Sequence, residues 1–401
     1  MQEVVVVSAV RTPIGSIGGT LKSMQPEDLL ALALGAAVER SGVDREVIDE
    51  VIAGQAKQTT DAPNIARVSA LAIRLPESTP AYTVHRQCAS GMQALLSAVQ
   101  QIQCGYSEVV LAGGVESMST APFYVRGARF GVGNGNGVFV DPNVESQPKS
   151  QPETIYGTFN MIQTADNVAA KYGVSREDCD AFALASQHKA VAAIDAGRFR
   201  DEVVPVDVPR RKGDPLRFET DEYPKRDTGV EKMAKLRPIF PGGVTTAGNA
   251  SGRNDGAAAL LLMSAEKAAQ LGLKPLAAIL GGAAAGVEPQ YMGIGPVLAT
   301  RKLMSRLTPQ TGLKLGDFGL VEINEAFAAQ SVACVRELGL DPEIVNVNGG
   351  AIALGHPLGC SGARICTTLL YEMRRCGTKH GLATICVAGG LGMSMAFEIR
   401  E

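Results

Sequence analysis

A cysteine at a strand-to-helix turn is the first residue in this sequence whose surroundings suit chemistry. Cys88 follows the β-type run 81–84 and precedes a helical pattern that starts at Met92, and the small residues 89–91 form the turn between them. A helix N-terminus favours a thiolate over a thiol, so the pattern predicts an activated cysteine nucleophile. The alternative is a small core cysteine, because free cysteines are among the most buried residues.

Three further motifs, distant from Cys88 in the sequence, carry residue types that suit proton transfer and carbonyl chemistry. They are Asn324-Glu325-Ala326-Phe327-Ala328, the glycine-rich stretch 348–359 with Gly355-His356-Pro357 within it, and Cys386-Val387-Ala388-Gly389-Gly390. Each residue alone is a weak signal. A lone histidine is more often a core or surface residue, and Cys386 by itself is typical of a strand core.

Taken in this order with Gln87-Cys88-Ala89-Ser90-Gly91, the motifs resemble those of the thiolases, which are acetyl-CoA C-acyltransferases. The resemblance covers essentially the whole chain, including Arg11-Thr12-Pro13 and the stretch 113–119. It implies an α/β fold of the thiolase type, with duplicated βα domains, mixed but mostly parallel sheets and an inserted loop domain. It also implies a reversible Claisen condensation of acetyl-CoA or, in the other direction, CoA-dependent thiolytic cleavage of 3-oxoacyl-CoA through an acyl-cysteine.

Thiolase chemistry explains why these residue types are needed. A cysteine can both attack a thioester carbonyl and leave from it, and by the resemblance Cys88 takes the acyl group. Because a free cysteine has a pKa of about 8.5, a base is needed near neutral pH, and His356 can accept the proton. The resemblance assigns to Cys386 the second acid–base role, at the acetyl-CoA carbon.

Negative charge develops on a thioester oxygen in each half-reaction, so two oxyanion sites are expected. The first resembles the family's site, built from His356 and a water held by Asn324. The second would use the backbone N–H groups of Cys88 and Ala388.

The resemblance also names residues that contact the substrate. Ser251 matches the family's contact to the pantetheine arm, and the apolar residues that match its pocket lining are Met161, Phe240, Met292 and Phe327. Core packing is the alternative for those four. The charged segment 209–237 is either a solvated surface or a rim that contacts the CoA phosphates, through Arg210, Arg211, Lys225 or Arg226. CoA is a substrate here, and no metal or tightly held cofactor is implied.

Three departures from the family pattern bear on the substrate. Asn160 stands where biosynthetic acetoacetyl-CoA thiolases carry a histidine, Ala388 replaces a usual glycine, and the loop 120–158 differs. The leading hypothesis is an acetyl-CoA C-acetyltransferase, and these departures keep a broad or longer-chain 3-ketoacyl-CoA thiolase as the alternative. A non-catalytic thiolase-like lipid carrier is disfavoured because all four residues with catalytic roles are present, namely Cys88, Asn324, His356 and Cys386. A condensing ketosynthase would need a second histidine in place of Asn324.

The elements that must position these residues alternate between strand and helix patterns in two halves of the chain. This alternation predicts a sheet covered by helices. The stretch 110–115 resembles 386–391, which indicates a duplicated domain whose equivalent loops meet at one place. The predicted domains are residues 1–120 with 248–271, an inserted loop domain at 121–247, and residues 272–401.

Bulk properties exclude several classes of protein. The net charge of the 401 residues is −3, which gives no reason to expect nucleic acid or a membrane surface as the partner. The apolar run 257–263 is far below the roughly 20 residues of a membrane span. The 8 cysteines are scattered without C-x-x-C pairs, as expected for a cytoplasmic, reduced protein. A homodimer or homotetramer is expected by the resemblance.

Overall fold

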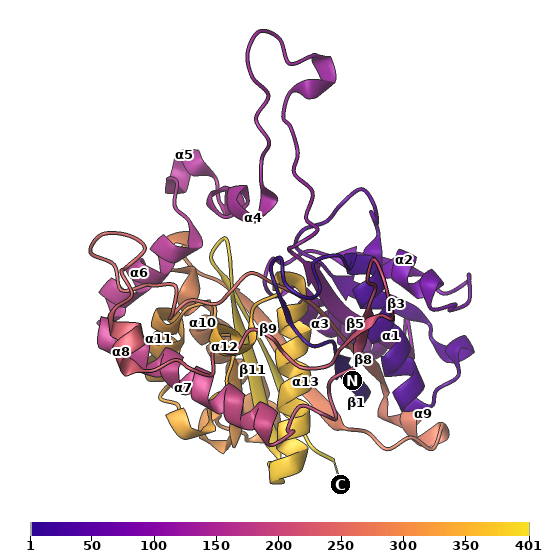
Figure 1. The fold of residues 1–401 in the computed structure, drawn as a ribbon. Helices are drawn as coiled ribbons and strands as arrows, with labels where there is room; N and C mark the ends of the chain where they lie inside the picture. The colour runs from indigo at the N-terminus through magenta and orange to yellow at the C-terminus, as the bar shows by residue number, and fades with distance from the viewer. Residues whose placement is uncertain (1, 401) are drawn as a thin grey trace.

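The predicted alternation of strands and helices is present in both halves of the chain (Figure 1). The computed structural model describes residues 2–400. The N-terminal half contributes β1 (Val4–Arg11), β2 (Gly15–Ser16), α1 (Pro26–Ser41), η1 (Arg45–Val47), β3 (Glu50–Gly54), α2 (Ile65–Ala72), β4 (Ala81–Val84), α3 (Ser90–Gln103), β5 (Val109–Ser117), β8 (Asn254–Ser264) and α9 (Ala265–Gln270). The C-terminal half contributes β9 (Ala277–Gly286), η4 (Pro289–Ile294), α10 (Gly295–Thr311), η5 (Leu315–Asp317), β10 (Leu320–Ile323), α11 (Ala328–Leu338), η6 (Pro342–Ile344), α12 (Ala351–Leu354), α13 (Leu358–Cys376), β11 (His380–Val387) and β12 (Leu391–Glu398).

Between β5 and β8 the chain leaves the large sheet. This segment contains η2 (Ala128–Phe130), α4 (Pro142–Glu145), η3 (Pro148–Ser150), α5 (Glu153–Tyr156), α6 (Met161–Tyr172), α7 (Arg176–Asp195), β6 (Val206–Val208), β7 (Leu216–Phe218) and α8 (Val230–Ala234). Its strands β6 and β7 pair only with each other. The sequence Ser175-Arg176-Glu177-Asp178 has the pattern of a capping box. The longest helix here, α7, begins with this box, in which Ser175 and Asp178 exchange side-chain and backbone hydrogen bonds.

The large sheet is mixed and runs in the order β10-β11-β12-β9-β1-β8-β5-β3-β4, with β2 paired to β8. Parallel pairs lie toward its two ends, where β10 pairs with β11 and β3 pairs with β4 and β5. The central pairs are antiparallel, because β8 returns to the sheet after the insertion and β12 follows β11 through a tight turn. Gly389 and Gly390 make that turn with φ of 87° and 80°, a conformation that favours glycine. The α/β class predicted from the sequence is confirmed, with more antiparallel pairing at the centre than expected.

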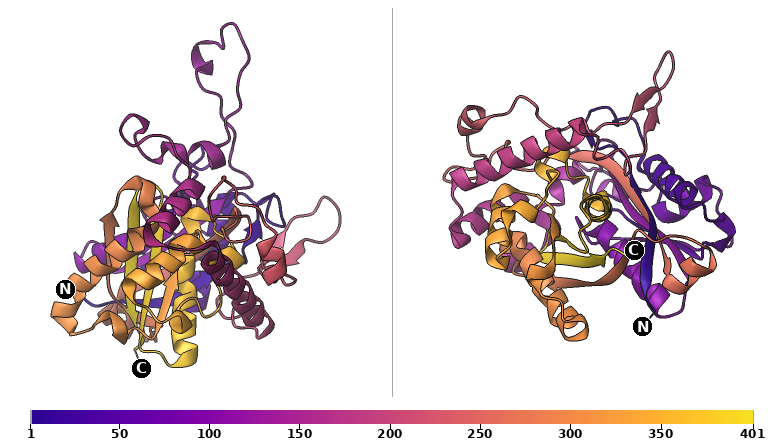
Figure 2. Two further views of the ribbon diagram at one scale, coloured as in Figure 1. Left: turned by 90° about the vertical axis from the view of Figure 1, so that its left-hand side faces the viewer. Right: turned by 90° about the horizontal axis from the view of Figure 1, so that it is seen from below.

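Two helices, one from each half, lie against each other in the middle of the molecule. Helices α3 and α13 contact strands of both halves, while α1 and α2 cover the outer N-terminal face and α10 and α11 the outer C-terminal face (Figures 1 and 2). A Cβ at Gly91 would lie 2.7 Å from the Gly359 carbonyl oxygen, and one at Gly362 would lie 2.5 Å from the Met92 nitrogen. Glycine therefore permits the close contact of the two helix N-termini, and the loops that precede them meet as predicted.

The local residue pattern predicts a strand at 345–347 and a helix that starts at Glu325, and both differ in the structure. The stretch 345–347 is not a strand, because Asn346 has φ +45° and only Val345 forms an isolated bridge, to Val321. The helix predicted from Glu325 begins at Ala328 instead. Residues 324–327 are thereby left in a loop, and Asn324 directly follows β10.

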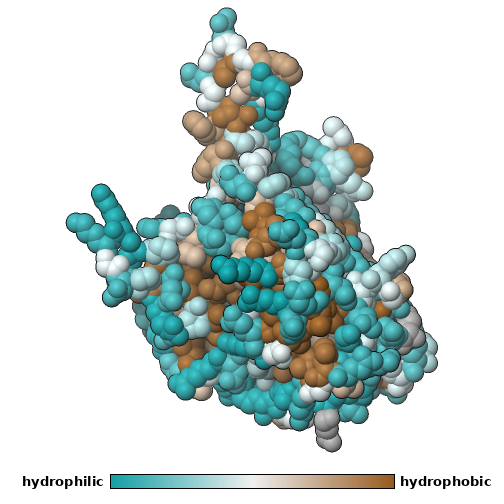
Figure 3. All heavy atoms as spheres, turned by 90° about the vertical axis from the view of Figure 1, so that its right-hand side faces the viewer, coloured by the Kyte–Doolittle hydropathy of each residue, from teal (hydrophilic) through white to brown (hydrophobic). Residues whose placement is uncertain are grey.

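A long arm projects from the body of the protein between β5 and α4 (Figure 1). Apolar side chains are exposed along it, including Phe130 at 94 % and Phe139 at 75 % exposure. Figure 3 shows these apolar surfaces on the arm.

Across residues 2–400, every helix is too short or too polar to cross a lipid bilayer. The same residues hold no cluster of three or more His, Cys, Asp or Glu side chains arranged to bind a metal ion.

Candidate active site

Cys88 stands on a tight turn between β4 and α3. Gln87, just before it, has φ +45°, in the left-handed region that residues with a side chain rarely adopt. The Ser90 hydroxyl holds this turn, accepting from the Arg86 N–H at 2.8 Å and donating to the Gln87 carbonyl at 2.7 Å. The strained backbone presents the half-buried thiol to a cavity, at the corner predicted from the sequence.

The protonation state of Cys88 differs from the sequence expectation. Burial has the largest effect and raises the pKa of the Cys88 thiol to about 11. The Ala388 N–H, the Lys57 ammonium and the N–H of Cys88 itself favour the thiolate but do not offset burial. The resting group is therefore a thiol. The two N–H groups still favour negative charge at its sulfur, and they are the donors predicted for the second oxyanion site.

His356 precedes α13 and is held in one tautomer. Its Nδ1 lies 2.6 Å from the Ser361 Oγ, whose own proton is donated to the Pro357 carbonyl at 2.8 Å. The serine oxygen can therefore only accept from the ring, which places the imidazole proton on Nδ1. The lone pair is left on Nε2, the nitrogen that lies 3.4 Å from Asn324 Nδ2. His356 also lines the cavity that contains Cys88, so its free lone pair can accept a proton there.

A Ser361→Ala variant should lower kcat roughly 10- to 100-fold, the usual effect of removing a group that orients a histidine. Without the serine oxygen the buried Nδ1–H has no acceptor, so the tautomer with the proton on Nε2 becomes competitive. That tautomer cannot accept a proton from Cys88. The ring tautomer, measured by nitrogen NMR of the 4 histidines, should shift together with kcat. A slower variant with an unchanged tautomer would assign Ser361 a merely structural role.

The His356 ring is neutral as well as oriented. Burial, together with the charge of Arg364, lowers the pKa of His356 to about 3 from its ordinary 6.5. A neutral imidazole can accept a proton near pH 7, whereas an imidazolium cannot. The resting pair is therefore a thiol and a neutral base.

Acid should destabilise the wild type more than a His356→Gln variant. Below pH 6.5 the unfolded histidine binds a proton that the folded one, with a pKa of about 3, does not bind. The stability due to the neutral ring is therefore complete above pH 6.5. It is lost as the pH falls toward 3, by up to about 1.4 kcal/mol per pH unit. Urea unfolding at pH 7 and pH 5 measures the difference, and equal pH slopes in both proteins would refute it.

Cys386 lies at the end of β11, next to the turn that holds Ala388. It is 1 % exposed and lines the same cavity as Cys88 and His356. Burial first, and then the proximity of Cys88, raise its pKa well above the ordinary value. The structure thus brings two thiols from the two halves of the chain into one cavity, and the Cys386 thiol is the more deeply buried.

Asn324 follows β10 and adjoins the cavity through His356. Its backbone N–H donates to the Thr384 carbonyl at 2.9 Å, which fixes the residue beside β11. Its Oδ1 is buried and receives no donor among the described residues. Such an oxygen can accept a bond from a water, which suits the predicted role of Asn324.

The cavity itself has a volume of about 330 Å³. Of the residues predicted to contact the substrate, Ser251, Met161, Met292 and Phe327 line it. The five predicted contact residues that do not line it are Phe240, Arg210, Arg211, Lys225 and Arg226. Lys225 Nζ lies 4.7 Å from the ring centre of Tyr223, which is itself a lining residue. The Arg226 guanidinium forms two hydrogen bonds to the exposed carboxylate of Asp195.

Sequence reasoning missed Lys57, Gln87, Tyr223 and Arg253 as residues of this cavity. For Lys57, the order of the strands in the sequence could have indicated that it lies near Cys88. It follows β3, and the carboxyl ends of adjacent parallel strands meet at one edge of a sheet. The loop after β3 therefore has to lie beside the loop that holds Cys88.

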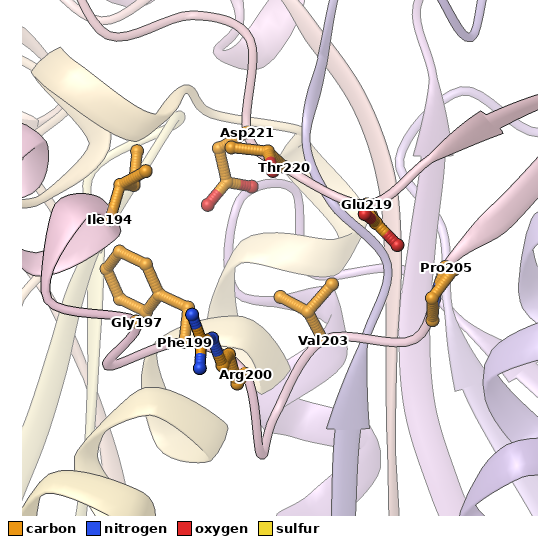
Figure 4. A pocket seen from close by; sticks show the side chains of 9 residues that line it. All are labelled: Ile194, Gly197, Phe199, Arg200, Val203, Pro205, Glu219, Thr220 and Asp221. Carbon is orange, nitrogen blue, oxygen red and sulfur yellow. The ribbon is translucent and has the colours of Figure 1, made fainter.

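A second hollow, of about 400 Å³, lies away from this chemistry (Figure 4). Its walls come from residues 194–205 and 219–221, and include Phe199 and Asp221. The Asp221 carboxylate already accepts two hydrogen bonds from the fully buried guanidinium of Arg11. Arg11 also pairs with Glu202 at 2.5 Å. This hollow therefore borders an ion-pair network that ties the insertion to β1.

Comparisons with known proteins show which family this chain resembles. Residues 4–266 match the thiolase N-terminal domain, and residues 273–399 match the thiolase C-terminal domain. An acetyl-CoA acetyltransferase of Chromobacterium violaceum is 51 % identical, over 99 % of each chain. The crystal structure of the Bacillus anthracis acetyl-CoA acetyltransferase is 46 % identical with a TM-score of 0.95, covering 100 % of this chain and 99 % of that one. That of human mitochondrial 3-ketoacyl-CoA thiolase in complex with CoA is 41 % identical with a TM-score of 0.93, covering 100 % and 98 %. The chain, matched along its length and carrying two thiols and a neutral histidine on one cavity, belongs to the thiolase family.

Proposed function

We propose that this protein is an acetyl-CoA C-acetyltransferase, which condenses two acetyl-CoA molecules and cleaves 3-oxoacyl-CoA in the reverse direction. The observation that carries the proposal is the meeting of Cys88, His356 and Cys386, from three separate motifs, on one cavity. The full-length relative named acetyl-CoA acetyltransferase supports it. A non-catalytic lipid carrier has no support, since a carrier needs neither an oriented base nor a second thiol.

In the cleavage direction, the Cys88 sulfur attacks the 3-oxo carbon as its proton passes to His356 Nε2. The proton transfer has to accompany the attack, because the resting pair is a thiol and a neutral ring. The bond between C2 and C3 of the substrate then breaks. Cys386 gives its proton to C2, which releases acetyl-CoA and leaves the acyl group on Cys88.

The second half-reaction returns the enzyme to its starting state. The thiol of an incoming CoA gives its proton to the Cys386 thiolate and attacks the acyl carbon. The bond to Cys88 breaks, and His356 returns the proton to the Cys88 sulfur. In the acyl-transfer steps the N–H groups of Cys88 and Ala388 bond the developing oxyanion. Their favourable effect on the Cys88 thiolate supports this role.

A broad or longer-chain 3-ketoacyl-CoA thiolase is the second candidate. The full-length similarity to human mitochondrial 3-ketoacyl-CoA thiolase favours it. The residue at position 160 also favours it. Biosynthetic acetoacetyl-CoA thiolases carry a histidine there, whereas this chain has Asn160, whose side chain caps the N-terminus of α6. Both candidates use the same chemistry at Cys88, so only the acyl-chain preference separates them.

The proposal also covers the cofactors, the metabolic role, the cellular location and the oligomeric state of the enzyme. CoA acts as a substrate, no metal or bound cofactor takes part, and the enzyme serves fatty-acid metabolism in the cytoplasm, where its 8 free cysteines remain reduced. A homo-oligomer is supported by two features of the fold. The arm exposes apolar side chains, and β4 is an edge strand that leaves one side open for pairing.

One assay tests the function. CoA-dependent loss of 3-oxoacyl-CoA is followed for acyl chains of increasing length, with a Cys88→Ser variant as the inactive control. An acetyl-CoA C-acetyltransferase should prefer acetoacetyl-CoA, whereas the second candidate should show equal or greater kcat/KM with longer chains. Absence of turnover at every length, in folded protein, would overturn both.

A further inference from the structure

One nucleophilic side chain in the active-site cavity has no part in the steps above. Lys57 is the one lysine among the described residues that line this cavity, and it is only 8 % exposed. Its ammonium donates one hydrogen bond, to the Ser146 hydroxyl. An ammonium has three N–H donors, so two remain without an acceptor among the described residues. The Lys57 nitrogen is therefore held by a single contact, on the same cavity as the Cys88 sulfur.

The backbone of Lys57 lies beside the turn that holds Cys88. Strands β3 and β4 are parallel, and Gly54 at the end of β3 pairs with Val84 at the end of β4. A Cβ at Gly54 would lie 2.2 Å from the backbone carbon of Ser90, so the end of β3 packs directly on the start of α3. Lys57 and Cys88 thus follow two adjacent strand ends, by three and four residues, on loops that are in contact.

The carboxylate next to Lys57 does not hold its ammonium. Glu116 is fully buried, and its Oε1 accepts the backbone N–H of Lys57 at 2.9 Å. Its Oε2 accepts the N–H groups of Ala56 at 3.0 Å and Gly359 at 2.9 Å. Both oxygens are thus bonded to the backbone, and burial lowers the pKa of Lys57 from its usual value. A lowered pKa increases the fraction of the neutral amine, which is the nucleophilic form of lysine.

Acylation of Cys88 favours this neutral amine further. Against the effect of burial, negative charges at Glu116 and at Cys88 raise the pKa of Lys57. Acylation removes the charge at Cys88, because the sulfur of a thioester is neutral. It also brings an acyl carbon into the cavity that Lys57 lines, so the two reacting groups are held close together. An amide is more stable than a thioester, and transfer of the acyl group from sulfur to nitrogen is therefore favourable.

We propose that Lys57 is a self-acylation site, whose amine takes the acyl group from Cys88 when no CoA arrives to collect it. The proposal rests on the thiolase activity proposed above. The ammonium first loses a proton to water, and the amine nitrogen then attacks the acyl carbon. The carbon–nitrogen bond forms, the bond to Cys88 breaks, and a proton passes from the nitrogen to the sulfur. The products are an N-acyl-lysine and a free Cys88 thiol, and no other reactant is consumed.

Acylation of Lys57 should block the enzyme. The acyl group stays in the cavity of about 330 Å³, and the positive charge of the ammonium is lost. An amide, unlike the thioester at Cys88, resists attack by the CoA thiol, so the acylated protein accumulates. Turnover should therefore decline irreversibly when acetyl-CoA is abundant and free CoA is scarce.

Mass spectrometry after a long incubation with acetyl-CoA tests the proposal. Hydroxylamine removes acetyl groups from sulfur but leaves those on nitrogen, so only amides remain after this treatment. Peptide mapping of the wild type should locate a resistant acetyl group at Lys57, which forms as activity declines. Added CoA should suppress it, because CoA collects the acyl group from Cys88. Lys57→Arg keeps the positive charge but offers no amine, so it should show no resistant group at position 57 and no decline in activity.

A Cys88→Ser variant separates transfer within the protein from direct acetylation of Lys57 by acetyl-CoA, and in it Lys57 should stay unmodified. Lys149 is the matched control, because it pairs with Glu153 at the surface and does not line the cavity. Its acetylation should be the same in the wild type and in Cys88→Ser. Equal acetylation of Lys57 in both proteins would overturn the proposal, and so would a wild type that acetylates Cys88 but never Lys57. Failure to acetylate Cys88 at all would instead overturn the proposed thiolase function.

Discussion

Replacing Cys88 with serine is expected to abolish the acyl-enzyme and to lower kcat for thiolysis by at least about 1,000-fold. A serine hydroxyl is far less acidic than a thiol, and the buried cavity already raises the pKa of the Cys88 thiol to about 11. The neutral His356 ring, a weak base, could not remove a proton from an alcohol in these surroundings. An oxygen ester would also give up its acyl group to CoA much more slowly than a thioester does.

Mass spectrometry of the intact protein after brief mixing with acetyl-CoA measures the effect. The wild type should gain the mass of one acetyl group, and Cys88→Ser should gain none. Cys104→Ser is the control, because Cys104 is an exposed free cysteine at the far end of α3 and should not affect acetylation. Acetylation of Cys88→Ser at the wild-type rate would show that another residue is the nucleophile.

Much of the site could be predicted because its residues lie in short motifs at the ends of strongly patterned elements. The β-type run before Cys88 and the apolar spacing after it correspond to β4 and α3. The similarity of the two halves correctly indicated that their loops meet, and Gly91 and Gly362 show how closely. The capping box at Ser175 is a local signal that the structure reproduces.

The rest could not be predicted because it depends on burial and on contacts between distant segments. The helix N-terminus at Cys88 suggested a lowered pKa, but desolvation by the surrounding chain outweighs it. The single tautomer of His356 depends on the Ser361 hydroxyl, whose proton goes to Pro357. Arg226 belongs to a charged segment, but its partner is Asp195, an exposed residue at the end of α7. None of these contacts leaves a pattern in the sequence.

The two thiols of the cavity differ in surroundings, and this difference separates their roles. Cys88 is half-buried, and the N–H groups of Ala388 and of its own backbone favour negative charge at its sulfur. Cys386 is more deeply buried, and the proximity of Cys88 further disfavours its thiolate. Cys88 is thus suited to attack, whereas Cys386 is suited to donate a proton to a carbanion.

A Cys386→Ser variant should therefore keep the first acyl transfer and lose carbon–carbon chemistry. In the synthetic direction, the attack on acetyl-CoA needs Cys88 and His356, and Cys386 only gives a proton to the departing CoA thiolate. Because a thiolate is a good leaving group, the acetylation rate should fall by less than about 10-fold. Condensation needs a base that removes a proton from the methyl group of the second acetyl-CoA. A serine hydroxyl cannot act as that base, so condensation should slow by roughly 100- to 10,000-fold, the contribution of a positioned acid or base.

Two measurements on the same variant separate these steps. Rapid mixing with acetyl-CoA gives the acetylation rate from the mass of the intact protein, and exchange of deuterium from solvent into the acetyl-CoA methyl group reports the proton removal. The exchange should nearly disappear in Cys386→Ser while acetylation continues. Cys334→Ser, also buried and close enough to raise the Cys386 pKa but outside the cavity lining, is the control for packing. If exchange and acetylation fell by the same factor in Cys386→Ser, the second thiol would be holding Cys88 in place and not moving the proton.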